Sequence, residues 1–210
     1  PEVDVSLRPG WYYHPDQDAK VKSPDSLMRI YVASVGRNAN LLINIPVDTR
    51  GLVHEADSAA LMGLQKLMNA GLKSQIKKND LMKASSFVTS HPVSFVRDSS
   101  EKSFWSAKEN DKAPSLNWDS NEARLINAVV LQEPIALGQR VKAFQIKLTD
   151  EQGQVEIVKG NTIGNMRILP FKARKVKSIQ VDFLDARGQI LLANFDLLYL
   201  ISTRNESLYH

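Results

Sequence analysis

The sequence has 210 residues, of which 43% are hydrophobic and 24% charged, and it contains no cysteine. This length and composition allow a substantial core in one large domain or two small ones and exclude a disordered protein, while the lack of thiols excludes disulfides and thiolate metal sites. The net charge of +4 suggests nucleic acid as a possible partner. The basic residues are scattered among 23 acidic ones, however, so we expect no nucleic-acid binding.

The first residues predict a β-strand that runs into an aromatic loop. Val3, Val5 and Leu7 alternate with polar residues, which is the two-residue period of a strand with two distinct faces. A proline and a glycine at positions 9 and 10 end the strand, because proline cannot donate to a ladder and glycine permits a turn. The tetrapeptide Trp11–His14 then places aromatic rings and an imidazole directly after the strand.

The next sixty residues predict a helix, a strand and a second helix. Ser23, Pro24 and Asp25 form a strong helix start, and Gly36 is placed to end that helix. Further predicted elements are a buried parallel strand at residues 41–45 and an amphipathic helix at 55–70. Two strand–helix units cannot cover both faces of a parallel sheet, so we expect further strands of this domain elsewhere.

The second half of the chain has an all-β pattern. Residues 73–86 are polar and basic, and we interpret them as a linker. From residue 87 onward, short β-branched and aromatic stretches recur between turn signals, which is typical of an antiparallel β-sandwich. The predicted strands are 124–132, 141–148, 155–159, 167–171, 176–183 and 195–200.

Two motifs in the first part of the chain carry a family resemblance. The stretches EVDVSLRPGWYYH at residues 2–14 and SVGRNANLLINIPVDTRGLVH at residues 34–54 resemble α-L-fucosidases of glycoside hydrolase family 29. Residues 130–141 and 162–169 are similar to the sandwich domain that follows the catalytic barrel in that family. Small departures are Tyr12, Ala39 and Val47, where the family usually has phenylalanine, glycine and proline.

The resemblance implies a fold that is α/β and then all-β. Residues 1–72 would be the last strand–helix units of a TIM-like (β/α) barrel, 73–86 a linker, and 87–210 a C-terminal β-sandwich domain. A complete barrel needs about 250 residues, so only its last quarter would be present.

The resemblance also implies a retaining exo-α-L-fucosidase that releases L-fucose from fucosylated glycans without a cofactor. In that family the nucleophilic aspartate and the acid/base glutamate lie upstream of these motifs, so no catalytic residue maps onto this chain and we expect the chain alone to be inactive. The missing N-terminal barrel segment would then be its partner, and the substrate class implies a periplasmic or extracellular, secreted protein. The alternative function is a non-catalytic carbohydrate-binding β-sandwich protein.

Trp11 is the first candidate for substrate binding, because an aromatic at the carboxyl end of a barrel strand faces the substrate and suits the methyl group of a deoxy sugar. The competing interpretation is that its indole only packs the loop. Arg8 can donate to a sugar hydroxyl or steady a carboxylate, and Tyr13 and His14 can line the mouth of the site or be structural.

Other polar and aromatic residues have structural and functional interpretations. Glu2, Asp4 and Arg8 can form a satisfied polar network, or can support the site beneath the sugar. We expect Asp48 to cap a loop and His54 to begin a helix.

The aromatic residues of the second half invite a sugar-stacking interpretation. Phe104, Trp105 and Trp118 can form a platform for a pyranose face, or can be core residues of the sandwich.

Neither a metal site nor a membrane span is expected. The four histidines are dispersed, without the paired spacing that places two ligands on one helical face or hairpin. The sequence also has no run of about 18 apolar residues, which a membrane-spanning helix requires.

Overall fold

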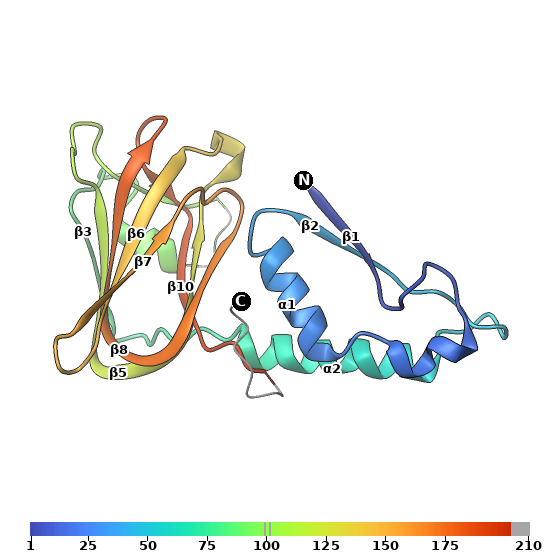
Figure 1. Ribbon diagram of the computed structural model, residues 1–210. Helices are drawn as coiled ribbons and strands as arrows, with labels where there is room; N and C mark the ends of the chain where they lie inside the picture. Colours follow the sequence, from blue (N-terminus) through green and yellow to red (C-terminus); the bar gives the residue numbers. More distant parts are fainter. Residues whose placement is uncertain (99, 101, 203–210) are drawn as a thin grey trace. The chain divides into compact units, whose positions relative to one another are not determined.

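The computed structural model describes residues 1–98, 100 and 102–202 of the chain. The chain forms two compact units, each with its own internal packing (Figure 1). Of the described residues, the first unit contains Pro1–Lys73 together with residues 200–202, and the second contains Ser74–Tyr199.

The first unit consists of two parallel strands and two α-helices. Its elements are β1 (Glu2–Ser6), the 3₁₀ helix η1 (Pro15–Lys20), α1 (Pro24–Ser34), β2 (Asn40–Asn44) and α2 (Glu55–Gly71). Strands β1 and β2 pair in parallel, with Ser6 opposite Asn44 at the ends of the pair. The connection between them runs through α1, as parallel pairing requires a crossover.

The helices begin where the sequence predicts. The Ser23 side chain accepts a hydrogen bond from the Ser26 backbone N–H, and Pro24 occupies the first helical turn of α1. His54 is the N-cap of α2, and its ring accepts a hydrogen bond from the Ala56 backbone N–H. The expectation that His54 begins a helix is therefore confirmed.

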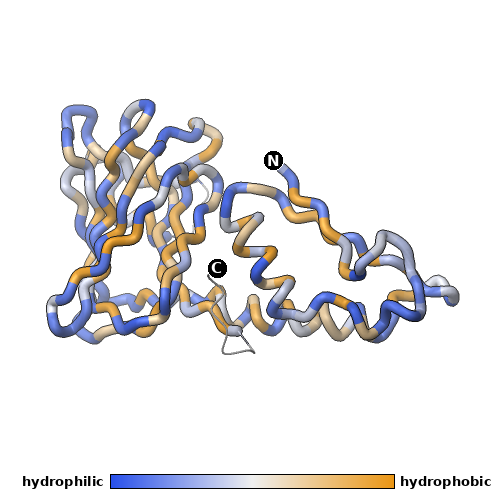
Figure 2. The backbone as a smooth tube through the Cα atoms, in the orientation of Figure 1, coloured by the Kyte–Doolittle hydropathy of each residue, from blue (hydrophilic) through white to orange (hydrophobic). Residues whose placement is uncertain are grey.

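The two-stranded sheet exposes apolar side chains. Leu42 in β2 is 53% exposed and Ile45 after it is 38% exposed, and Figure 2 shows hydrophobic residues along both strands. The β1 strand ends at Ser6, although the alternation of the sequence continues to Arg8. Leu7 still donates its backbone N–H to the Asn44 carbonyl at 3.1 Å, and the chain then turns Arg8 into the interior.

The second unit is an antiparallel β-structure. Its elements are β3 (Leu81–Ala84), η2 (Val93–Arg97), β4 (Trp105–Ser106), β5 (Ser115–Gln132), η3 (Ile135–Leu137), β6 (Val141–Thr149), β7 (Val155–Gly160), β8 (Arg167–Ala186), β9 (Leu191–Leu192) and β10 (Asn194–Leu198). The main sheet has the order β10-β5-β8-β6-β7, with β3 also paired to β5, while β4 and β9 form a separate pair.

Two long strands form the centre of this sheet. Strands β5 and β8 pair along most of their length, with register shifts between Asp119 and Arg124 and between Ile126 and Ala128 of β5. Such irregularities bend a strand and increase its twist. The first part of β5 pairs with β3 and its last part with β10, so one strand serves two regions of the sheet.

Several strand boundaries differ from the sequence-based expectation. Strand β8 is continuous through residues 172–175, where two separate strands were expected, and β5 begins nine residues before the expected 124. Strand β3 lies inside the expected linker 73–86 and pairs with residues 116–119 of β5. The second unit accordingly begins at Ser74, because the polar segment that follows the helix is held by sheet pairing.

The second unit has a continuous hydrophobic core. It is built from large side chains that point inward from both the long strands and the loops, including Trp105, Trp118, Phe144, Phe171, Phe183 and Phe195. In the loops at one end, the buried Glu133 carboxylate accepts three backbone N–H bonds, from Arg140 at 2.7 Å, Val141 at 2.9 Å and Gly164 at 2.7 Å. This carboxylate satisfies donors of two separate loops at once.

Candidate functional site

The aromatic loop after β1 is tied to the ends of both parallel strands. The Ser6 hydroxyl donates to the Gly10 carbonyl at 2.7 Å. The Asn44 side-chain amide donates both to the Ser6 hydroxyl oxygen at 3.1 Å and to the Trp11 carbonyl at 2.9 Å. The first half of the loop is therefore held by two side chains that face each other across β1 and β2.

Arg8 is buried and directed toward protein groups. Its guanidinium donates to both carboxylate oxygens of Asp57 on α2, at 2.5–3.1 Å. It also donates to the Asp18 carboxylate at 2.8 Å and to the His14 carbonyl at 3.3 Å. The guanidinium lies 4.7 Å from the centre of the Tyr13 ring. Of the two roles expected for Arg8, this geometry shows the steadying of carboxylates.

The Arg8–Asp57 pair in this cluster is closed to solvent, whereas Asp18 is 34% exposed. The side chains of Arg8 and Asp57 are both 0% exposed, and hydrogen bonding to Asp57 raises the pKa of Arg8. Removing one partner of a buried, hydrogen-bonded ion pair typically costs about 3–5 kcal/mol, because the other charge stays buried without compensation. The cluster thus fixes the position of η1 and of the aromatic loop against α2.

Sequence reasoning placed Arg8 in a polar network with Glu2 and Asp4, and the structure gives it different partners. Both acidic residues are exposed on β1, whereas Arg8 pairs with Asp57 and Asp18. The strand bends after Ser6, which removes Arg8 from the face that the two acids share.

The sequence did contain a signal that Asp57 is buried and paired with a positive charge. This residue lies three, seven and ten positions before Ala60, Leu64 and Leu67, on the apolar stripe of its helix. A carboxylate on such a stripe requires a buried partner.

The aromatic residues of the loop differ in exposure. Trp11 is 51% exposed and Tyr12 80% exposed, and His14 is also exposed. Tyr13 is half-buried, with its ring 5.7 Å from the His54 ring, and partial burial raises the pKa of its hydroxyl. The Trp11 and His14 side chains are thus open to solvent, while the Tyr13 ring lies beside His54, the N-cap of α2.

A second ion pair stands beside this loop. The Arg50 guanidinium donates to the Asp48 carboxylate at 2.6 and 2.9 Å, and the backbone N–H groups of Arg50 and Leu52 donate to the same carboxylate. These bonds, led by the Arg50 side chain, lower the pKa of Asp48 to about 2. The expectation that Asp48 caps a loop is confirmed.

The tryptophans of the second unit are core residues. Trp105 and Trp118 are both 0% exposed. Their indole N–H groups donate to the Ser86 carbonyl at 2.9 Å and to the Asp80 carboxylate at 3.2 Å. Phe104 stacks on His91 with the ring centres 4.3 Å apart. A sugar platform built on these two tryptophans is therefore ruled out.

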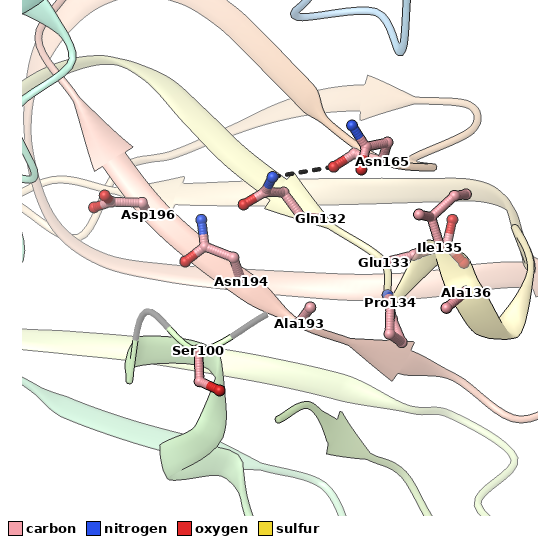
Figure 3. Close-up of a pocket in the computed structure, with 10 residues that line it drawn as sticks. All are labelled: Ser100, Gln132, Glu133, Pro134, Ile135, Ala136, Asn165, Ala193, Asn194 and Asp196. Carbon is pink, nitrogen blue, oxygen red and sulfur yellow. Dashed lines mark hydrogen bonds between the residues drawn. The ribbon is translucent and has the colours of Figure 1, made fainter. Parts of the chain in front are cut away.

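A cavity of about 690 Å³ opens beside β5 and β10 in the second unit (Figure 3). Gln132 and Asn194 face each other across the paired strands, and Gln132 donates to the Asn165 carbonyl at 3.1 Å. Asp196, two residues further along β10, also lines the cavity, and burial raises the pKa of its carboxyl. Among the described residues that line it none is aromatic, so it offers amides and a carboxylate without a stacking surface.

Residues 1–98, 100 and 102–202 contain neither a candidate metal cluster nor a candidate membrane-spanning helix. No group of three or more histidine or acidic residues in these ranges could hold a metal ion. In the same ranges, no helix combines the length and apolar character that crossing a membrane requires.

Comparison with known proteins agrees with both halves of the chain. Residues 2–73 match the alpha-L-fucosidase family model, and residues 82–193, just over half of the chain, match that of the F5/8 type C domain. A rice protein (Oryza sativa subsp. japonica) named putative alpha-L-fucosidase 1 is 30% identical over 199 residues, 92% of this chain. The chain belongs to the α-L-fucosidases of glycoside hydrolase family 29. The resemblance in the two sequence motifs is thereby confirmed.

Solved structures of family 29 place this chain within a larger fold. A putative alpha-L-fucosidase from Bacteroides thetaiotaomicron superposes with a TM-score of 0.88 at 25% identity, covering 95% of this chain and 44% of that one. The chain spans only 38% of the rice relative. The family 32 carbohydrate-binding module of NanJ from C. perfringens, solved with galactose, shares the sandwich fold, with a TM-score of 0.51 at 17% identity over 57% of this chain and 93% of that one.

Proposed function

We propose that the complete protein containing this chain is a retaining exo-α-L-fucosidase that releases L-fucose from fucosylated glycans. Membership of family 29 supports this activity. The structural observation that carries it is Trp11, half-exposed on a tethered loop at the carboxyl end of β1. Catalytic sites of barrels form at this end of the strands, and an indole suits the methyl group and apolar face of a deoxy sugar.

In this proposal, β1, α1, β2 and α2 are the last strand–helix units of a (β/α) barrel. The parallel pairing of β1 and β2 across α1 supports this assignment. The exposed Leu42 and Ile45 also support it, since apolar residues on a parallel sheet are normally covered on both faces. The remaining barrel strands would come from other parts of the enzyme.

The two reacting carboxyl groups of a retaining glycosidase, about 5–5.5 Å apart, would also come from those parts. The buried carboxylates of the first unit are already committed to structural bonds: Asp57 to Arg8, Asp48 to Arg50, and Asp25 to the Ser202 hydroxyl. We therefore expect residues 1–210 alone to show no turnover, with Trp11 supplying one wall of the fucose site and His14 and Tyr13 bordering it.

The test is hydrolysis of an aryl α-L-fucoside by the complete protein, its Trp11→Ala variant and residues 1–210 alone. We expect the Trp11→Ala change to lower kcat/KM about tenfold or more, because an aromatic contact to the sugar is lost. Phe87→Ala is the matched control, since it removes an exposed aromatic, 46% accessible, from the second unit. If the unaltered complete protein released no fucose, the proposed activity would be wrong. If residues 1–210 alone released fucose, the claim that the reacting carboxyl groups come from other parts of the enzyme would be wrong.

The substrate class also suggests where the enzyme works. Fucosylated glycans are found mainly outside the cytoplasm, so we place the complete protein in the periplasm or outside the cell. Fractionation of the producing cells, followed by fucosidase assay of each fraction, tests this placement, and activity confined to the cytoplasmic fraction would contradict it.

A second candidate is a non-catalytic carbohydrate-binding protein. The F5/8 type C match and the fold shared with a galactose-binding module favour it, while the burial of Trp105 and Trp118 counts against it. Calorimetric titration of the chain with fucosylated and galactosylated glycans separates the two, because this candidate requires saturable binding without turnover.

A further inference from the structure

The aromatic loop is hydrogen-bonded at two positions, to strand β2 through Asn44 and to helix α2 through Arg8 and Asp57. At the first end, one amide group of Asn44 bonds to the Ser6 hydroxyl and to the Trp11 carbonyl. At the other end, Arg8 donates to the His14 carbonyl while Asp57 holds the guanidinium. The bonds to the Trp11 and His14 carbonyls each join a side chain to the loop backbone, so the path of that backbone is fixed independently of the aromatic side chains.

We propose that Asn44 is a positioning residue that holds Trp11 as a fixed wall of the fucose site and thereby sets selectivity for a methyl-bearing sugar. This inference rests on the proposed fucosidase function. Arg8 plays the corresponding part at the far end of the loop.

The geometry of Asn44 suits this role. A side-chain amide nitrogen carries two N–H donors, and here its two partners are the Ser6 hydroxyl oxygen at 3.1 Å and the Trp11 carbonyl oxygen at 2.9 Å. The backbone of Asn44 is itself fixed, because its carbonyl accepts the Leu7 N–H at 3.1 Å and the residue pairs with Ser6 in the sheet. Asn44 therefore projects a rigid pair of donors from the last position of β2.

A change of Asn44 to aspartate removes this function with almost no change in shape. A carboxylate accepts hydrogen bonds only, so it would place a negative oxygen against the Trp11 carbonyl oxygen in place of a donor. We expect the loop to move away from β2 and the indole to lose its fixed position. Pre-organisation of this kind decides how strictly a pocket discriminates, since a misplacement of about 1 Å is enough to weaken binding and rate.

The substrate that detects a loss of the fixed Trp11 position is an L-galactoside. It differs from an L-fucoside only in carrying a hydroxymethyl group where fucose carries a methyl. An apolar wall rejects an added hydroxyl by about a hundredfold. A displaced Trp11 should reject the L-galactoside less. The ratio of L-fucoside to L-galactoside hydrolysis therefore reports the position of the Trp11 side chain more directly than either rate alone.

The experiment compares the complete protein with its Asn44→Asp and Asn40→Asp variants. Asn40 begins the same strand and has an exposed side chain, so it receives the same chemical change at the other end of β2. For Asn44→Asp we expect KM for the aryl α-L-fucoside to rise about tenfold with a smaller change in kcat, and fucoside-over-galactoside selectivity to fall about tenfold. Asn40→Asp should leave both quantities unchanged.

A third variant protects the test against misfolding. Asn44→Ala removes both donors without adding a charge, and it should show the same loss of selectivity with an unchanged far-UV circular dichroism spectrum and an unchanged cooperative thermal transition. If folded Asn44 variants kept the KM and selectivity of the unaltered protein while Trp11→Ala lost them, the positioning role would be overturned and the fucosidase function would stand. If the unaltered protein did not hydrolyse the fucoside, the function and this inference would fall together.

Discussion

At the scale of single residues, the first unit is organised by ion pairs that bring distant parts of the chain together. Arg8 and Asp57 are 49 positions apart, and both are removed from solvent. Asp48 and Arg50 are close in sequence, and the arginine side chain of that pair is 54% exposed. The first pair holds a loop against a helix, while the second closes the turn that precedes α2.

The Asp48–Arg50 pair makes stability depend on pH in the acid range. The folded pKa of Asp48 is about 2, below its ordinary value, because Arg50 bonds to the charged carboxylate. A carboxyl with a lowered folded pKa stabilises the fold fully above about pH 4, and this contribution is lost as the pH falls toward about 2. We expect carboxyl ¹³C NMR of Asp48 to give a titration midpoint near the lower of these values.

The matched variants are Arg50→Gln and Arg37→Gln. Loss of the Arg50 guanidinium should raise the pKa of Asp48 toward its ordinary range, whereas loss of Arg37, an exposed arginine in the turn before β2, should leave it in place. An Asp48 signal that titrates normally in the unaltered protein would contradict the structural assignment.

The roles that sequence alone predicted at this scale are those with local causes. Asp48 bonds to backbone groups two and four residues away, and His54 to one two residues away, so neighbouring residues revealed both. The partner of Arg8 was missed because it comes from a helix whose packing depends on the whole unit. The bond from Asn44 to the Trp11 carbonyl was missed as well, because it comes from a second strand 33 positions away.

At the scale of elements, the two helices of the first unit meet through a glycine. A side-chain carbon added at Gly63 of α2 would lie 2.4 Å from the ring of Pro24 at the start of α1. The proline ring cannot rotate away, so this close approach requires a residue without a side chain. The same proline that begins α1 thus also fixes where α2 crosses it.

Gly63→Ala should therefore destabilise the protein, although alanine favours helix. The propensity gain of about 1 kcal/mol is smaller than the cost of overpacking at a rigid contact, so we expect a net loss of about 1–2 kcal/mol. Asn69→Ala is the control, since it is an exposed position in the same helix and should be neutral or slightly stabilising. Thermal unfolding of both variants checks this, and a raised midpoint for Gly63→Ala would refute the contact.

The helices were predictable in full, whereas the long strands were predicted only in part, at 124–132, 167–171 and 176–183. Caps and apolar stripes are local signals, so α1 and α2 begin and end close to their expected positions. Strands β5 and β8 continue through polar stretches because neighbouring strands pair with them on both sides. The composition of a segment does not reveal which strands will pair with it, so these stretches were not predicted to be strand. Strand β3 was expected to be linker for the same reason.

At the scale of the whole molecule, the two units differ in how much core each contains. The large buried aromatic side chains of the core cluster all belong to Ser74–Tyr199. The first unit buries a smaller set of apolar residues around its helices, and its sheet has two strands. These residues are Leu7, Leu27, Met28, Val32, Ala60, Leu64, Leu67 and Leu200. Two strands without further partners are marginally stable in water.

Expressed separately, residues 74–199 should fold and residues 1–73 should not. The separate second unit should unfold cooperatively and give a strong near-UV circular dichroism signal from the buried Trp105 and Trp118. Residues 1–73 should lack a cooperative transition. A molten second unit, with no near-UV signal, would show that its core depends on residues outside 74–199.

Glu133 has a consequence for engineering this domain. One carboxylate organises the backbone at Arg140, Val141 and Gly164, so two loops far apart in sequence share a single anchor. We therefore expect the exposed η3 turn to accept grafted peptide segments without redesign of its neighbours, provided that Glu133 is retained. The backbone conformation of these two loops would then be set by the Glu133 carboxylate and would not depend on the sequence of the grafted segment.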